Sequence, residues 1–135
     1  MGSGVKTVLF VCVENSCRSQ MAEAFATMLG HGMIDARSSG SRPSGTVNPK
    51  AIASMREVGY DLSSHTSKSL TEIPAIEYDV VVTMGCGDQC PTVRAQHRLD
   101  WDIPDPKHLA PERFAEVRDV IRRNVEQLIA SLSTR

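Results

Sequence analysis

The sequence predicts an α/β protein with a parallel β-sheet and helices on both faces. Two patterns alternate along the chain: short apolar segments, and longer segments whose apolar residues recur every three or four positions. The first pattern is typical of strands buried in a sheet, and the second is typical of amphipathic helices. Strands that alternate with helices favour a parallel sheet, because each parallel connection needs a crossover that a helix can supply.

Four segments are predicted as strands. The third is the most regular and contains Val80, Val81 and Val82 in succession. The fourth is followed by two prolines on either side of Asp105, and proline cannot continue a central strand. The predicted strands cover residues 5–11, 33–39, 78–84 and 98–103.

Three segments have helical spacing. Gly30 suits the C-terminal end of the first helix, and Asn48 with Pro49 suits the start of the second, which Gly59 ends. Pro111 can open the third helix. Residues 41–47 and 63–69 are polar and are predicted as loops. The apolar faces comprise Met21, Phe25, Met28 and Leu29 in the first helix, Ala51, Ile52, Met55 and Val58 in the second, and Phe114, Val117, Ile121, Val125, Leu128 and Leu132 in the third.

The length and composition narrow the class of protein. The chain has 135 residues, which favours a single domain over residues 1–135. Its 15 basic and 16 acidic residues give a net charge of −1, which argues against a nucleic-acid partner. No apolar segment has the length of a membrane span and no secretory signal opens the chain, so we expect a cytoplasmic protein with no membrane partner. Four cysteines then favour catalysis, redox chemistry or metal binding over structural disulfides.

A polar loop with a cysteine and an arginine follows the first predicted strand. Cys12 ends the strand, five residues separate it from Arg18, and helical spacing begins directly afterwards. The N–H groups of such a loop and of the helix start can converge on an oxyanion, and Arg18 adds a planar set of donors. These positive surroundings favour the thiolate form of Cys12, a nucleophile. The predicted oxyanion-binding residues are Val13, Glu14, Asn15, Ser16, Cys17, Arg18 and Ser19.

The two cysteines of this loop also have simpler interpretations. Cys12 could be a small buried apolar side chain, although this does not account for the polar residues that follow it. Cys17 is expected to pack at the start of the helix, and a protective disulfide between Cys17 and Cys12 is an alternative.

The loop resembles that of the low-molecular-weight protein tyrosine phosphatase family, and residues 15–23 resemble its arsenate reductase branch. Two further segments, Val47-Asn48-Pro49-Lys50-Ala51-Ile52 and His65-Thr66-Ser67, carry the same resemblance. It implies a four-stranded parallel sheet with helices on both faces. Such a sheet would bring three loops to one end, where ligands bind in open α/β sheets: residues 12–18, 85–91 and 104–106.

The resemblance implies that Asp105 is a general acid. Two prolines hold its carboxyl group on a stiff loop, although Asp and Pro are also common in simple turns, and Asp102 is the second candidate. In the tyrosine phosphatases two tyrosines typically follow the Asp-Pro pair. Here Lys107 and His108 follow it, and the aromatic content is only 4%, which argues against a phosphotyrosine substrate.

Two more cysteines, Cys86 and Cys90, lie in the loop after the third predicted strand. A phosphatase needs no electron donor, whereas the reduction of arsenate to arsenite needs two electrons, which a second thiol can supply by forming a disulfide. The resemblance to the thioredoxin-coupled arsenate reductases implies a disulfide relay of these two cysteines. Because Cys86 is nearer the predicted strand end and lies between Gly85 and Gly87, we expect it to attack Cys12 first and Cys90 then to attack Cys86, with the reverse order as the alternative. These two cysteines lie only four positions apart, closer than in those reductases, and Gly85 is an additional residue before the first.

Metal binding is considered at two places. Zinc bound by Cys86 and Cys90 with His97 or His108 is an alternative to the disulfide relay, although no second cysteine pair exists. Some relatives bind potassium beside the loop, and here Lys68 stands where those relatives have an aspartate. We therefore predict no metal and no cofactor. The matching positions are Asn15, Glu23, Ser38, Thr66 and Lys68.

The sequence therefore predicts an arsenate reductase that acts in arsenic detoxification. Cys12 would attack arsenate held by Arg18, Asp105 would protonate the departing oxygen, and Cys86 and Cys90 would form the final disulfide. The expected reductant is thioredoxin, with glutaredoxin or a low-molecular-weight thiol as alternatives. A low-molecular-weight tyrosine phosphatase and a non-catalytic thiol redox sensor are the alternative functions.

Overall fold

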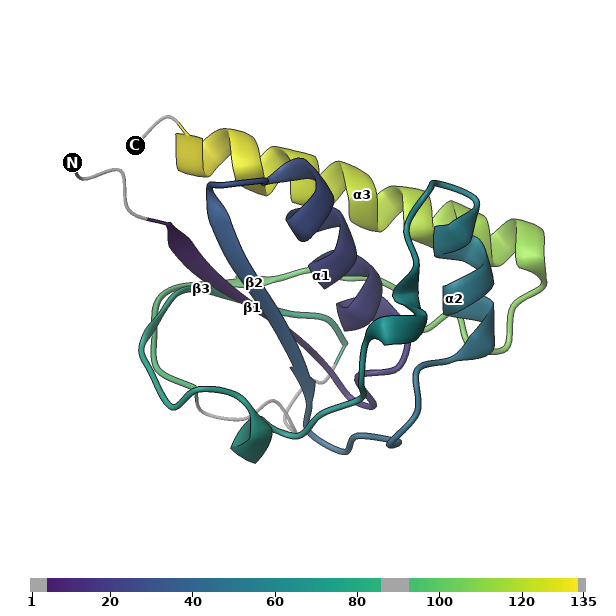
Figure 1. Ribbon diagram of the computed structural model, residues 1–135, viewed down its shortest axis with the longest axis horizontal. Helices are drawn as coiled ribbons and strands as arrows, with labels where there is room; N and C mark the ends of the chain where they lie inside the picture. Colours follow the sequence, from purple (N-terminus) through teal and green to yellow (C-terminus); the bar gives the residue numbers. More distant parts are fainter. Residues whose placement is uncertain (1–4, 86–92, 134–135) are drawn as a thin grey trace.

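The computed structural model describes residues 5–85 and 93–133. Strands and helices alternate along these residues, and Figure 1 shows the long C-terminal helix lying across the molecule. In chain order the elements are β1 (Lys6–Cys12), α1 (Arg18–Leu29), β2 (Ile34–Gly40), α2 (Pro49–Arg56), the 3₁₀ helices η1 (Leu62–Ser64) and η2 (Leu70–Glu72), β3 (Tyr78–Thr83), β4 (Ala95–Asp100) and α3 (Pro111–Ser133).

The strands form one parallel sheet in the order β2-β1-β3-β4. The last residue of β1, Cys12, lies opposite Gly40 of β2, and Val11 lies opposite Thr83 of β3. Thr83 in turn lies opposite Asp100 of β4. The prediction of a four-stranded parallel sheet is confirmed. Because the carboxyl ends are level, the segments that follow β1, β3 and β4 all leave the sheet at the same edge.

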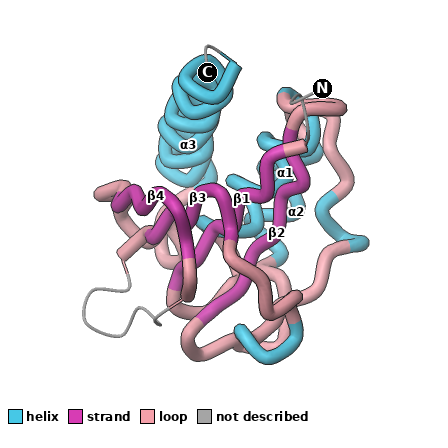
Figure 2. Tube along the Cα trace, turned by 90° about the vertical axis from the view of Figure 1, so that its left-hand side faces the viewer, coloured by secondary structure: helices cyan, strands magenta, loops and turns pink. Residues whose placement is uncertain are grey.

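Helical segments lie on both faces of the sheet, but they cover them unequally. On one face, residues such as Val8 and Phe10 pack in a single apolar cluster with residues of α1, α2 and α3. On the other face, Leu9 and Val11 pack with Leu70 of η2 and its neighbourhood. In Figure 2, α3 lies above the sheet and a short helix lies below it. The layer that contains α1, α2 and α3 therefore covers one side of the loop that follows β1.

The fourth strand differs from its prediction. The apolar residues near 99–103 indicated a strand over residues 98–103, but β4 occupies Ala95–Asp100, three positions earlier. Pairing with β3 fixes the bounds of β4. Because β4 is exposed over most of its length, its sequence lacks the apolar pattern of a buried strand. Trp101 packs against Phe10 with ring centroids 5.9 Å apart, and Ile103 is buried beyond the strand end. Those two apolar side chains belong to the core without belonging to the strand.

Smaller differences concern turns and helix ends. The predicted loop over residues 63–69 contains the end of η1, and η2 was not predicted. Helix α2 ends at Arg56, and Gly59 has a φ of +87° just beyond it. Gly30 caps α1 as predicted, with an ordinary φ of −99°.

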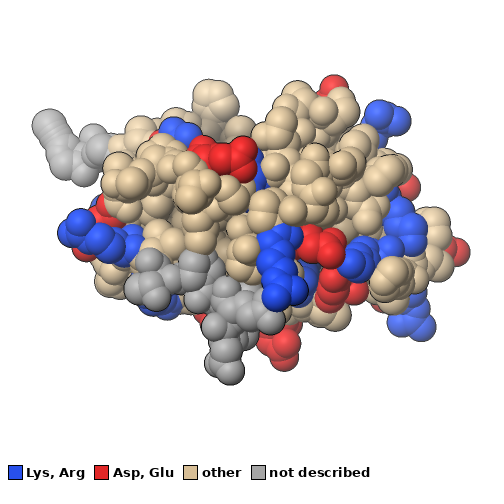
Figure 3. All heavy atoms as spheres, turned by 90° about the horizontal axis from the view of Figure 1, so that it is seen from below, with Lys and Arg blue, Asp and Glu red and all other residues tan. Residues whose placement is uncertain are grey.

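The surface carries charges of both signs. Figure 3 shows Lys and Arg side chains interspersed with Asp and Glu on the face that it presents, without a single positive stripe. Among the described residues, no helix is both long enough and apolar enough to cross a membrane.

Candidate active site

The loop between β1 and α1 turns its backbone N–H groups inward. Its carbonyl oxygens at Cys12, Val13, Glu14 and Ser16 accept hydrogen bonds from the N–H groups of Ser41, Arg42, Ser44 and Asn48, respectively. The N–H and C=O groups of a trans peptide point in opposite directions. Since these carbonyl groups point outward, the N–H groups of Val13, Glu14, Asn15 and Cys17 point into the loop. The predicted oxyanion-binding segment therefore has the backbone orientation that an anion site needs.

Two residues allow the loop to curl this tightly. Asn15 has a φ of 51°, a left-handed conformation that asparagine adopts more readily than most residues. Gly40, at the end of β2, lies directly against the loop, and a Cβ atom there would be 2.6 Å from the carbonyl oxygen of Val13. A residue with a side chain at position 40 would push the loop away from the sheet.

The Cys12 sulfur is hydrogen-bonded to the Ser19 hydroxyl group. Cys12 Sγ lies 2.9 Å from Ser19 Oγ, and Asn15 Nδ2 donates to the same Oγ at 2.7 Å. The hydroxyl group that accepts from Asn15 still has its own hydrogen available for the sulfur, and either atom of the Cys12–Ser19 pair can be the donor. All three side chains are buried. The loop therefore holds the Cys12 sulfur beside a buried hydroxyl group.

A buried glutamine connects this loop to a histidine. Gln20 Nε2 donates to Asn15 Oδ1 at 2.9 Å and to the carbonyl oxygen of Thr66 at 2.9 Å. Gln20 Oε1 lies 2.9 Å from His65 Nδ1, and as an acceptor it requires that nitrogen to carry a proton. His65 Nε2 then accepts from the Tyr60 hydroxyl at 2.6 Å. Burial lowers the pKa of His65, which agrees with a neutral, structural histidine.

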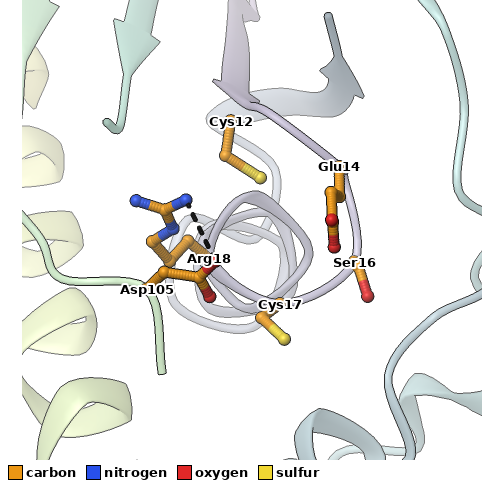
Figure 4. A pocket seen from close by; sticks show the side chains of 6 residues that line it. All are labelled: Cys12, Glu14, Ser16, Cys17, Arg18 and Asp105. Atoms are coloured by element: carbon orange, nitrogen blue, oxygen red, sulfur yellow. Dashed lines mark ion pairs between the residues drawn. The ribbon is translucent and has the colours of Figure 1, made fainter. Parts of the chain in front are cut away.

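Arg18 and Asp105 meet across a small pocket. Figure 4 shows the six side chains that line it, with the guanidinium of Arg18 beside the carboxylate of Asp105. Arg18 Nη2 lies 3.8 Å from Asp105 Oδ2, and Arg18 Nη1 donates to the carbonyl oxygen of Ile103 at 3.0 Å. The pocket is lined by Cys12, Glu14, Ser16, Cys17, Arg18 and Asp105. The structure thus brings the predicted nucleophile, arginine and acid together, whereas Asp102 is exposed and is not among the lining residues.

Cys17 lines the same pocket as a protonated thiol. Burial, and secondarily the charge of Asp105, raise the pKa of Cys17 from its ordinary 9.0 to about 12. Cys12 and Cys17 are both free in this structure, so no disulfide joins them. Cys17 packs at the start of α1, as the sequence indicated.

An ion pair at the rim of the pocket escaped the sequence analysis. Lys107 Nζ lies 2.8 Å from Glu14 Oε2, and this hydrogen bond raises the pKa of Lys107. The backbone N–H of Lys107 also donates to Asp105 Oδ1 at 3.1 Å. Lys107 thus links the Asp105 segment to the Cys12 loop. No local sequence signal connects positions 14 and 107.

The residues matched to a potassium site do not fit a bound cation. Lys68 Nζ donates to the carbonyl oxygen of Thr66 at 2.8 Å and lies 4.0 Å from Glu23 Oε1. Ser38 Oγ donates to the same carboxylate oxygen of Glu23. The ammonium group therefore already supplies a positive charge among these oxygens. Within residues 5–85 and 93–133, no group of three or more His, Cys, Asp or Glu side chains is placed to hold a metal ion.

Cys86 and Cys90 lie outside the described residues, so their predicted roles and the zinc alternative remain predictions. Gly85, the residue before Cys86, is described and lies two residues beyond the end of β3, at the edge of the sheet where Cys12 lies.

The fold and the pocket define a class of protein: an α/β protein that presents a cysteine inside a loop whose backbone N–H groups face inward. A family profile described as "Low molecular weight phosphotyrosine protein phosphatase" matches residues 7–135. The chain belongs to this family, as its sequence motifs indicated.

Several relatives carry the name arsenate reductase. The chain is 45% identical over 132 residues to a "Glutaredoxin arsenate reductase" of Synechocystis sp., covering 96% of this chain and all of that protein. It is 40% identical to "Arsenate reductase 1" of Staphylococcus epidermidis, covering 90% of this chain and 93% of the relative. A solved structure of "An arsenate reductase in the phosphate binding state" is similar with a TM-score of 0.86 and 45% identity, over 95% of this chain and 99% of that one.

Proposed function

We propose that this protein is a cytoplasmic arsenate reductase and that residues 1–135 act as a single domain. The observation that carries the proposal is the position of the Cys12 sulfur, which lies within an inward-facing N–H loop and 2.9 Å from the Ser19 hydroxyl. Arg18 and Asp105 line the same pocket. The names of the relatives support arsenate as the oxyanion.

The proposed cycle supplies the two electrons that the reduction of arsenate to arsenite needs. The Cys12 thiolate attacks As(V) held by Arg18 and the loop amides, and Asp105 protonates the oxygen that leaves as water. Cys86 then attacks the Cys12 sulfur, an S–S bond forms, the S–As bond breaks, and its electron pair reduces arsenic to As(III), released as arsenite. Cys90 attacks the Cys86 sulfur, which frees Cys12 and leaves a Cys86–Cys90 disulfide. An external thiol reduces that disulfide.

The reductant is proposed to be thioredoxin, with glutaredoxin or a small thiol as alternatives. A Corynebacterium glutamicum structure described as a thioredoxin-dependent arsenate reductase is 30% identical, with a TM-score of 0.79 over 99% of this chain and 65% of that chain. The Synechocystis relative is instead named for glutaredoxin. Arsenate-dependent oxidation of NADPH tests the choice, with thioredoxin and thioredoxin reductase in one assay and glutaredoxin, glutathione and glutathione reductase in the other. Absence of arsenite formation with every reductant would contradict the proposed function.

The rim of the pocket favours reduction over hydrolysis of a phosphotyrosine. Lys107 and His108 follow Asp105-Pro106, where the phosphatases typically have two tyrosines, and Lys107 pairs with Glu14, so no tyrosine stands there to hold an aryl group. We expect slow hydrolysis of p-nitrophenyl phosphate relative to arsenate reduction. The reverse order of rates would favour the phosphatase alternative.

Single-turnover experiments with cysteine variants test the relay. With one equivalent of arsenate, Cys90→Ser should release one arsenite and trap a Cys12–Cys86 disulfide, detected by peptide mass mapping. Cys86→Ser should stop at the arsenic adduct. A trapped Cys12–Cys90 disulfide with normal turnover in Cys86→Ser would reverse the order. Steady turnover by the Cys86/Cys90 double serine variant with glutaredoxin and glutathione would exclude the relay.

A further inference from the structure

Gly85 lies directly against the guanidinium group of Arg18. Its φ is +76°, a conformation that residues with side chains rarely adopt. A Cβ atom built at position 85 would lie 3.3 Å from Arg18 Cζ and closer still to Arg18 Nη1, well inside van der Waals contact. The guanidinium group therefore occupies the space that any side chain at position 85 would need.

Arg18 is confined by its other neighbours too. Its Nη1 donates to the Ile103 carbonyl oxygen at 3.0 Å, and its Nη2 lies 3.8 Å from Asp105 Oδ2. Its side chain is only 8% exposed. These contacts and the adjacent Gly85 backbone together restrict where the guanidinium plane can lie beside the Cys12 pocket. A planar group binds a tetrahedral oxyanion well only in the correct orientation, so the neighbours that set this plane also set the anion affinity.

We propose that Gly85 is a positioning residue for oxyanion binding. The absence of a side chain at position 85, just beyond the end of β3, lets Arg18 pack against the backbone and face the pocket. For arsenate, this inference rests on the proposed function. The contact between Gly85 and Arg18 should affect the binding of any tetrahedral oxyanion in the same way. Gly85 acts through Arg18 and does not itself touch the oxyanion.

Inorganic phosphate is a suitable probe because it is tetrahedral and is not reduced. We expect Gly85→Ala to weaken phosphate binding by about tenfold or more, the effect of losing one good hydrogen bond to a charged group. Titration calorimetry on the full chain measures the dissociation constant. In steady state, the same variant should raise the KM for arsenate by more than it lowers kcat.

The chain offers a matched control at Gly59. Gly59 has a φ of +87°, close to that of Gly85, but a Cβ atom there would meet nothing within 4 Å. Gly59→Ala therefore imposes a similar backbone strain without touching Arg18, and it should keep phosphate binding within about twofold of the wild type. Equal phosphate affinities in Gly85→Ala and Gly59→Ala would overturn the proposal.

A second background tests whether the effect passes through Arg18. Lysine lacks the guanidinium plane, so Gly85→Ala should cause little further loss of phosphate binding in an Arg18→Lys protein. An equal loss in both backgrounds would contradict a role through Arg18. If Gly85→Ala alone does not fold, recovery of folding in the Gly85→Ala/Arg18→Lys protein supports the clash, and failure of both proteins to fold refutes it. If the wild type does not reduce arsenate, the proposed function is refuted. The comparison of phosphate affinities between the glycine variants would still test the role of Gly85.

Discussion

Replacement of Asp105 by asparagine separates acid catalysis from anion binding. Asparagine keeps the size of the side chain and an oxygen for the N–H of Lys107, which donates to Asp105 Oδ1 at 3.1 Å. It removes the acidic proton and the charge that faces Arg18. The variant therefore leaves the local geometry in place while it removes the proposed general acid.

Loss of the Asp105 charge should affect anion binding much less than loss of its acidic proton affects the rate. Asp105 is 42% exposed and its oxygen lies 3.8 Å from Arg18 Nη2, so this ion pair is worth at most about 1 kcal/mol, or about fivefold in anion affinity. Loss of a general acid typically costs about 10²–10⁴-fold in rate, which corresponds to about 3–5 kcal/mol. We therefore expect kcat for arsenate to fall by about 10²–10⁴-fold, while phosphate affinity changes by no more than about fivefold.

A single-turnover assay is the suitable measurement, because a slow disulfide step could mask the chemical step in steady state. Excess enzyme is mixed with arsenate, and arsenite is measured against time. Asp102→Asn is the control, since Asp102 is exposed and does not line the pocket, and it should react like the wild type. An Asp105→Asn protein of nearly normal rate beside an inactive Asp102→Asn protein would refute the assignment.

Three further predictions concern the surroundings of the pocket. At pH 8, iodoacetamide should label Cys12 well before Cys17, whose pKa is about 12. The folded state holds the Cys17 proton more tightly than the unfolded state does, so the contribution of this thiol to the free energy of unfolding should be fully present below about pH 9. It should fall as the pH rises toward 12, by at most about 1.4 kcal/mol per pH unit. Gln20→Leu should lower the free energy of unfolding in urea by at least about 2 kcal/mol, because several buried partners lose their hydrogen bonds. Arsenate reduction should proceed equally in potassium and choline chloride, because the Lys68 ammonium group already neutralises Glu23, and Lys68→Asp should make it depend on potassium.

Each of these three has a clear contrary result. Equal labelling of the two loop cysteines at pH 8, or a stability that rises between pH 9 and 12, would contradict the burial of the Cys17 thiol. A Gln20→Leu protein as stable as the wild type would show that the buried amide network contributes little. Activation of the wild type by potassium would contradict the role of Lys68 as the internal positive charge.

Local sequence determined most of the framework. The strands β1, β2 and β3 lie within one residue of their predicted bounds, because apolar segments between turn residues mark buried strands directly. The spacing of Cys12 and Arg18 also predicted the loop at the start of α1. Such features depend on residues that are neighbours in the chain, so the order of residues is sufficient to reveal them.

Tertiary structure alone decided the position of β4 and the partners of the site residues. An exposed edge strand has no apolar pattern, so its bounds follow from pairing with β3. Lys107 meets Glu14, and Gln20 meets His65, across long stretches of chain. The space beside Arg18 is likewise closed by a glycine far along the sequence. Contacts of this kind arise only when the parallel sheet brings the carboxyl ends of its strands together, and no local pattern of residues records which side chains then meet.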